Sequence, residues 1–314
     1  MFTAVFKLAV TGILMWLLFH KIDFEPTIIR LSHMHAGWAC FAVVILFAQL
    51  ILTSIRWYLV CDLLGARVRF ILACRLTLVG QFFNQILPSS VGGDAVRIWQ
   101  LSENGILLRR ALSSVICDRI TALIVLTLIV AITLPIIILT GSVEFPYVLP
   151  IAITISLATL AIFFIFLWGE AFHALLIKLP YLRSLGALLR DLRIVLVESY
   201  SSVKVIIICV VVQIMVACSI YFIGLALEVK LNLLHFVILP LILLLSSLPI
   251  SFAGWGLRES IMIIGLNFGG ISEHDALAIS ISFGIAQIFV GLPGMAITIL
   301  RSFKSDLLSL KKKE

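Results

Sequence analysis

Charged residues are scarce in this sequence, and their scarcity excludes the common soluble classes. Only 12% of the 314 residues are Asp, Glu, Lys or Arg, whereas a soluble domain carries about 25%. Hydrophobic residues make up 62% of the chain, and apolar runs of roughly 20 residues, enough to span a bilayer, recur throughout. The sequence therefore predicts an all-α polytopic membrane protein. Membrane topology explains the net charge of +7 better than nucleic acid does, so no nucleic-acid partner is expected.

Motifs for chemistry are equally scarce. The sequence has no G-x-x-x-x-G-K, no H-E-x-x-H and no paired-aspartate motif of a metal-dependent transferase. Its six cysteines contain no C-x-x-C pair and mostly lie in apolar runs, which is typical of buried free thiols. We interpret His33 and His35 as interfacial loop residues rather than metal ligands. We therefore expect no catalytic residue, no metal and no cofactor, in a protein that is not an enzyme.

Six segments are long and apolar enough to cross a bilayer, and two more are broken by proline. The predicted spans cover residues 2–20, 38–60, 112–140, 147–168, 203–226 and 276–300. The broken segments are 71–87 with a short second arm at 94–101, around Pro88, and 232–248 with a second arm at 257–268, around Pro249. An arm of about eight residues rises only about 12 Å, against about 30 Å of hydrocarbon. We therefore predict six transmembrane helices and two re-entrant helical hairpins.

Basic residues indicate the two sides of the membrane. If both hairpins enter and leave on one face, every Lys and Arg is cytoplasmic except Lys21, Arg30, Lys230 and Arg258. If segment 71–87 crossed alone, the basic stretch 169–201 would move outside, against the positive-inside rule. We therefore predict that both termini are cytoplasmic, with a basic tail at 301–314. Four tryptophans near predicted span ends fit an aromatic belt, namely Trp16, Trp38, Trp57 and Trp168.

The two proline-broken segments resemble each other. LPSSVGGDAVR (87–97) and LPISFAGWGLR (248–258) share Leu, Pro, Ser, Gly and Arg in register. Each follows two spans and precedes one, which predicts two copies of span, span, hairpin and span, about 1–140 and 147–300. Three crossings per copy is an odd number, so the copies are inverted within one domain that covers 1–314. Inverted repeats with broken helices that meet near the midplane are typical of transporters.

Ionisable side chains mark the hairpins as the candidate binding site. Irregular backbone at membrane depth needs protein or a water-filled cavity around it, and each turn leads into a helix N-terminus with free N–H groups. Arg97 and Arg258 lie in the first turns of these helices, where the helix dipole repels a cation. An anion such as a lipid phosphate would resolve the conflict. The alternative is a structural ion pair of Arg97 with Asp94 or Asp118, and of Arg258 with Glu259 or an acid on the external side.

The remaining candidates lie close to the first turn. Gln81 and Gln85 lie one turn apart on the entering arm, with Asn84 beside them. They either line a path for a headgroup or form hydrogen bonds to neighbouring helices. Asp118 and Arg119, at the cytoplasmic end of an overlong third span, face either the cavity or the membrane interface.

These blocks resemble a known family. Asn84, the block LPSSVGGDAVR and the later block AGWGLRE (253–259) are similar to the lysylphosphatidylglycerol synthase transmembrane family, over nearly the whole chain. Its members are flippase-like membrane domains, fused to a soluble aminoacyl-transferase in multiple peptide resistance factors and also found alone, and this sequence resembles a solitary member. The positions on the family's motifs are Asn84, Pro88, Gly92, Gly93, Asp94, Arg97, Gly254, Gly256, Arg258 and Glu259. With Pro249, the prolines and glycines of this set would form the hairpin turns, and Trp255 departs from the smaller residue expected there.

The resemblance implies a lipid translocase of the bacterial cytoplasmic (inner) membrane, which moves an anionic phospholipid or a lipid-linked sugar between leaflets. The residues that would bind the headgroup are Gln81, Asn84, Asp94, Arg97, Asp118, Arg119, Arg258 and Glu259. Two alternatives stay open: a membrane enzyme such as a polyprenyl-phosphate sugar transferase, and an accessory subunit of lipid-linked glycan assembly. Membrane lipids are the expected partners, and a homo-oligomer or a partner in envelope biosynthesis is compatible with each hypothesis.

Overall fold

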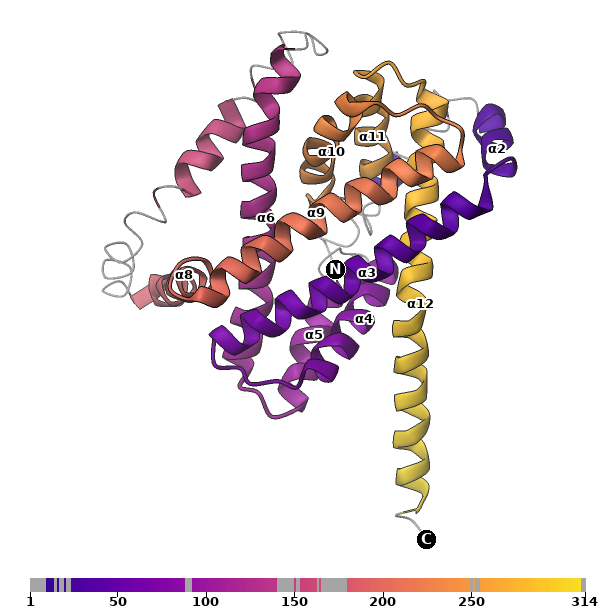
Figure 1. Ribbon diagram of the computed structural model, residues 1–314. Coiled ribbons are helices and arrows are strands. Elements are labelled where there is room, and N and C mark those ends of the chain that lie inside the picture. The colour runs from indigo at the N-terminus through magenta and orange to yellow at the C-terminus, as the bar shows by residue number, and fades with distance from the viewer. Residues whose placement is uncertain are drawn as a thin grey trace.

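The computed structural model shows an entirely helical architecture over the residues that it describes (Figure 1). These residues are 10–13, 16, 20, 24–87, 92–139, 150, 153–162, 164, 180–248, 251 and 255–311.

Four helices are long and apolar enough to cross a bilayer, and they make this a multi-pass membrane protein. They are α3 (Ala36–Leu63), α6 (Leu108–Leu139), α9 (Tyr200–Ala226) and α12 (Glu273–Lys311), with the apolar part of α12 ending at Leu300. The shortest of them, α9, has 27 residues and rises about 40 Å, which exceeds the roughly 30 Å of hydrocarbon. The predicted spans 38–60, 112–140, 203–226 and 276–300 are confirmed as apolar helices of sufficient length.

The other two predicted spans fall largely outside the described residues. Of the segment 2–20 only residues 10–13, 16 and 20 are described, and of 147–168 only 150, 153–162 and 164. Within the second segment, Ile153–Ile162 forms a short apolar helix. The count of six spans therefore stays a prediction.

Two pairs of short helices occupy the positions of the predicted hairpins. The first pair is α4 (Phe70–Ile86) and α5 (Gly92–Glu103), and the second is α10 (Leu233–Ser246) and α11 (Leu257–Asn267). The two helices of each pair pack against each other. The pairs lie on opposite sides of the two diagonal helices in Figure 1, α4 and α5 below α3 (Ala36–Leu63) and α10 and α11 above α9 (Tyr200–Ala226). Pro88 and Pro249 lie outside the described residues. Further short elements among the described residues are α2 (Phe24–Ser32), η1 (Pro180–Leu182) and α8 (Arg183–Leu196).

The long helices α3 and α9 pack side by side in opposite directions. The backbone N–H of His35, before α3 begins, donates to the carbonyl of Ala226 at the end of α9, at 2.7 Å. At the other end of the pair, Arg56 of α3 contacts Cys209 of α9. The aromatic rings of Trp38 and Phe222 stack between the two helices, with centroids 5.6 Å apart. This antiparallel pair forms the diagonal centre of the molecule in Figure 1.

Each short pair packs partly on its neighbour in sequence and partly on the other half of the chain. The second arms pack on the helix that follows them, α5 on α6 and α11 on α12. The first arms also pack across the molecule, α4 on α12 and α10 on α6. The contacts of one half therefore have counterparts in the other.

Glycines on α12, which have no side chain, let α4 approach closely. A Cβ at Gly294 would collide with the carbonyl of Leu78, and one at Gly291 would lie 3.3 Å from Cα of Phe82. One step further along, the side-chain amide of Gln85 donates to Oε1 of Gln287 at 3.1 Å. Small residues and side-chain amides are the usual means by which membrane helices associate. The interpretation of Gln85 as a bond between helices is therefore correct.

Candidate functional site

Five charged side chains from three helices meet around the first short pair. Arg56 comes from α3, Asp94 and Arg97 from the first turns of α5, and Asp118 and Arg119 from α6. Arg56, Asp94, Arg97 and Asp118 are each at most 5% exposed. We call these five residues the charge cluster. Such burial of ionisable groups among apolar helices is costly and usually marks function.

Asp118 is held by two arginines. Arg56 donates to both of its carboxylate oxygens, from Nε at 2.8 Å and from Nη2 at 3.2 Å. This is the bidentate geometry that makes guanidinium–carboxylate pairs strong. Nη2 of Arg97 lies 3.7 Å from Oδ2 of the same carboxylate, an ion pair without a hydrogen bond.

Asp94 is shared by the two remaining arginines. Arg119 donates to it bidentately, from Nε at 2.6 Å and from Nη2 at 3.1 Å. Arg97 donates from Nη1 to Oδ1 at 3.2 Å, across one turn of α5. Both structural ion pairs that the sequence allowed for Arg97, with Asp94 and with Asp118, are therefore present.

Arg97 nevertheless keeps donors without an acceptor. Within the part of the chain that the structure describes, its buried Nε and Nη2 have no hydrogen-bond partner. Its guanidinium carbon lies 3.9 Å from the centroid of the Trp57 ring, a cation–π contact that stabilises the charge but supplies no acceptor. Three arginines against two aspartates also leave one positive charge uncompensated within the cluster. An anion would complete both the hydrogen bonding and the charge balance.

A polar cavity of about 230 Å³ opens beside this excess charge. That is nearly eight times the volume of one water molecule in the liquid, about 30 Å³, which is room for a compact polar group. The polar residues that line it are Gln49, Thr53, Arg56, Thr77, Gln81, Asn84, Arg97, Asp118, Arg119 and Gln213. The structure therefore brings five of the eight predicted headgroup residues together on one cavity, with Asp94 bonded directly behind them.

The hairpin itself is fastened by Asn84. Its side-chain oxygen accepts the N–H of Gly93 at 2.9 Å, which ties the start of α5 to the end of α4. A Cβ at Gly93 would collide with the carbonyl of Gly80 and with this same oxygen, because the two helices approach backbone to backbone here. Of the other turn residues, Gly92 begins α5, and Pro88 lies outside the described residues.

Replacing Gly93 with alanine is therefore expected to destabilise the protein. The added methyl group must separate α4 from α5, and overpacking of this kind costs about 1–3 kcal/mol. The midpoint of thermal unfolding in detergent measures the effect. Gly12→Ala is the matched control, since a Cβ at Gly12 has nothing within 4 Å. Equal midpoints for the two variants would contradict the close approach.

Arg258 and Glu259 form a separate, self-neutralising pair on α11. Glu259 accepts from Arg258 Nε at 3.1 Å and Nη2 at 2.7 Å, and from the backbone N–H of Gly256 at 2.6 Å. The hydroxyl of Ser280 on α12 donates to the same carboxylate at 3.3 Å. Gly256 has a φ of 82°, in the left-handed region that favours glycine, so the chain turns there directly into α11. The structural ion pair weighed for Arg258 is therefore present, while the turn residues Pro249 and Gly254 lie outside the described residues.

This second pair lies outside the cavity of the charge cluster, since neither Arg258 nor Glu259 lines that cavity. In Figure 1, α11 and α5 lie on opposite sides of the α3–α9 pair. Arg258 instead fills the space beside Gly284 of α12, where a Cβ would collide with its guanidinium. The two matching sequence motifs therefore lie in different environments. The environment of Arg97 is cationic and open, whereas that of Arg258 is neutral and closed.

Sequence reasoning missed two members of the site. Arg56 was counted only as a cytoplasmic charge, although an arginine at the end of a long apolar run is itself a signal. Trp57 was assigned to an aromatic belt, and that assignment is wrong, because its side chain is fully buried beneath Arg97.

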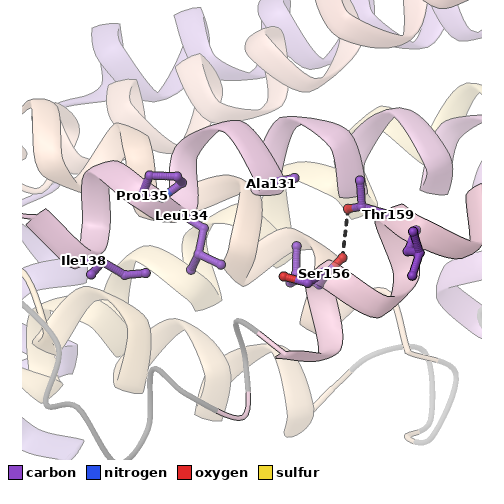
Figure 2. A pocket seen from close by; sticks show the side chains of 8 residues that line it. Ala131, Leu134, Pro135, Ile138, Ser156 and Thr159 are labelled. Carbon is purple, nitrogen blue, oxygen red and sulfur yellow. Dashed lines mark hydrogen bonds between the residues drawn. The ribbon is translucent and has the colours of Figure 1, made fainter. Parts of the chain in front are cut away.

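A larger cavity, of about 540 Å³, has a different character. Figure 2 shows it between α6 and the helix 153–162, where Leu134, Pro135 and Ile138 face Ser156 and Thr159. The hydroxyl of Thr159 donates to the Ile155 carbonyl of its own helix at 2.8 Å, so it offers little to a headgroup. This surface suits acyl chains. Among the described residues, no three His, Cys, Asp or Glu side chains come together to hold a metal ion.

Comparison with known proteins identifies a family and a relative. A model of the protein family described as the lysylphosphatidylglycerol synthase TM region matches residues 4–294. A UPF0104 membrane protein of Archaeoglobus fulgidus is 33% identical over 70 residues, which are 22% of this chain and 21% of that protein. The alignment therefore spans about a fifth of the relative's length.

Proposed function

This chain belongs to the lysylphosphatidylglycerol synthase transmembrane family, and on that premise we propose that it is a lipid translocase for an anionic phospholipid or a lipid-linked sugar. The observation that carries the proposal is the charge cluster, with its one uncompensated positive charge beside a polar cavity among apolar helices. A lipid phosphate supplies what the cluster lacks, namely one negative charge and oxygens that accept from Arg97. Movement between leaflets requires such a cavity, because a bare headgroup is costly to place in hydrocarbon.

In this proposal the carboxylates position arginines and do not take part in chemistry. Asp94 and Asp118 each accept bidentate hydrogen bonds from an arginine, and Glu259 accepts from Arg258, Gly256 and Ser280. A general base needs a carboxylate that is available to the reacting proton. These three instead hold arginines in place. We propose on this ground that the protein moves lipid rather than modifies it.

The architecture that suits this function is an inverted repeat of six spans and two re-entrant hairpins, about 1–140 and 147–300, with both termini in the cytoplasm of a bacterium. The cross-packing of α4 on α12 and of α10 on α6 supports it. On α12, Gly284 contacts Arg258 and Gln287 contacts Gln85, three residues apart or about 4.5 Å along the helix axis. The two hairpins thus meet α12 at nearly the same depth, as they must in a site near the midplane.

The topology can be tested by labelling single cysteines. In a background without the six native cysteines, Cys at Tyr181 should react only after the inner face is made accessible, whereas Cys at Lys230 should react from outside. Both positions are exposed, so neither result is limited by burial. Labelling of position 181 from outside would overturn the inverted arrangement, because the second copy would then have the wrong orientation.

The function can be tested with purified protein in liposomes. Fluorescent phosphatidylglycerol should cross the bilayer faster than phosphatidylcholine with the same label, because only the former carries the net negative charge that the cluster lacks. Neither a nucleotide sugar nor charged tRNA should be needed. If the protein instead moves no anionic lipid and transfers a sugar or an aminoacyl group, the enzyme alternative replaces this proposal. Protein-free liposomes give the background rate.

A further inference from the structure

A second site lies outside the charge cluster, where α8 packs against the beginning of α6. The two helices enclose a groove of about 910 Å³. Arg109 of α6 and Arg183 of α8 line it, together with Ser113 and Ser184. The rest of the lining is apolar and includes Leu112, Ile116, Leu185 and Leu188. We call this space the α6–α8 groove.

The amphipathic character of α8 explains how the groove is built. Its C-terminal part buries Leu192, Val195 and Leu196 against the start of α9 and the neighbouring part of α6. Its N-terminal part leaves Arg183 and Leu185 exposed. In Figure 1, α8 is seen nearly end-on while α6 runs up the picture, so α8 crosses the direction of the spans. A basic amphipathic helix in this orientation lies in the membrane interface.

The groove combines a cationic rim with apolar walls, and this combination selects its occupant. Leu112 is 40% exposed and Leu185 46% exposed, so the walls are open to the surroundings. A soluble phosphate would use only the arginines and leave these walls wet. An anionic phospholipid uses both, with its phosphate at Arg109 and Arg183 and an acyl chain along the leucines.

The charged residues in the described lining of the groove are both arginines, Arg109 and Arg183. Asp191 of α8 lines an adjoining cavity with Arg109 and Arg110. Arg110 also donates to the carbonyl of Gly65, in the loop after α3, at 2.7 Å.

The groove also leads toward the charge cluster. Arg109, Leu112, Ile116 and Arg119 follow each other at three- and four-residue steps along α6, and residues so spaced share one helix face. Arg119 is half-exposed and donates to Asp94 inside the cluster. The ten residue-to-residue steps from Arg109 to Arg119 cover about 15 Å along the helix axis. One face of α6 thus joins an interfacial groove to the buried cavity.

We propose that the α6–α8 groove is a loading site for anionic phospholipid from the cytoplasmic leaflet, from which the headgroup passes by Arg119 to Arg97. The direction of this route rests on the proposed translocase function, whereas the binding site itself does not. The groove holds the lipid at the interface, and the charge cluster takes it across.

A photoactivatable phosphatidylglycerol in phosphatidylcholine nanodiscs tests the site with full-length protein. Cross-links should map to residues 108–116 and 183–188, and unlabelled phosphatidylglycerol should displace them while soluble glycerophosphate should not. The double variant Arg109→Gln with Arg183→Gln should lower cross-linking by about tenfold or more, the loss expected when charged hydrogen bonds are removed. Arg67→Gln with Arg69→Gln is the matched control, since it removes two exposed basic residues of the same predicted face outside the groove.

The outcomes separate this inference from the proposed function. Unchanged cross-linking in the groove variant, or an equal loss in the control, would overturn the loading site. Arg97→Gln should lower translocation about 10- to 100-fold and leave cross-linking in the groove intact. Groove cross-linking in a protein that translocates nothing would defeat the translocase proposal alone. Translocation without any groove cross-linking would defeat the loading site alone.

Discussion

Replacing Arg97 with glutamine is expected to lower translocation of an anionic lipid about 10- to 100-fold, the factor that corresponds to losing a charged hydrogen bond of about 1.5–3 kcal/mol. The folded protein should stay nearly as stable as the wild type. The reason is the charge balance, because removal of Arg97 leaves two arginines and two aspartates. Arg56 still holds Asp118 bidentately, and Arg119 still holds Asp94.

Two measurements check this expectation, the initial rate of translocation in liposomes and the midpoint of thermal unfolding. Arg97→Lys should fall between wild type and glutamine, since lysine keeps the charge but loses the planar fork and much of the stacking on Trp57. A large drop in the unfolding midpoint of Arg97→Gln would show that Arg97 serves structure. Recovery of activity in the double variant Asp94→Asn with Arg97→Gln would lead to the same conclusion.

A change to the ion pair of the second hairpin should instead lower stability and affect translocation only through folding. Glu259→Gln leaves Arg258 buried without a charge partner and turns an amide N–H₂ toward groups that donate. Breaking one side of a buried ion pair in this way costs about 3–5 kcal/mol. We therefore expect a large fall in the unfolding midpoint, with activity lost only in proportion to the folded protein lost.

Replacing both partners separates the effect of the unpaired charge on stability from the effect of side-chain shape. Arg258→Met with Glu259→Gln removes the stranded cation, so it should recover much of the stability that the single variant loses. Its recovery stays incomplete, because the backbone N–H of Gly256 still needs its acceptor. If Glu259→Gln unfolds at the wild-type temperature and yet translocates poorly, then Glu259 belongs to the transport site and the two hairpins are not different in kind.

The helical class and the positions of the hairpins could be predicted from the sequence because they depend on local features. Apolar length predicts α3, α6, α9 and α12, and a proline followed by glycines predicts where the short pairs break. The sequence could not distinguish Arg97 from Arg258, since each has a first-turn motif with an acid nearby. The difference arises from tertiary contacts. Arg119 on α6 bonds to Asp94 of the first hairpin, and Arg56 on α3 holds Asp118 beside Arg97. Ser280 and Gly284 on α12 instead contact the second hairpin.

The close approaches between helices could not be predicted from the sequence for a similar reason. Gly93 was recognised as a turn residue, but its contact with Gly80 follows from the crossing of two helices rather than from either sequence position. The same holds for Trp57, which lies near a span end like the other tryptophans and is distinguished only by the guanidinium above it. Charge excess is likewise a property of the assembled cluster and has no linear signature.

The packing of α4 on α12 also has a consequence for biosynthesis. Gln85 and Gln287, which bond across this contact, are 202 residues apart in the chain. At ribosomal rates of 5–20 residues per second, roughly 10–40 s separate their synthesis. Throughout that interval the first hairpin lacks the helix that Leu78 and Phe82 pack against, and its arginines and aspartates are assembled on an incomplete scaffold. A nascent chain interrupted before α12 would leave this face of α4 without its packing partner, so the first hairpin reaches its full set of contacts only after α12 has been made.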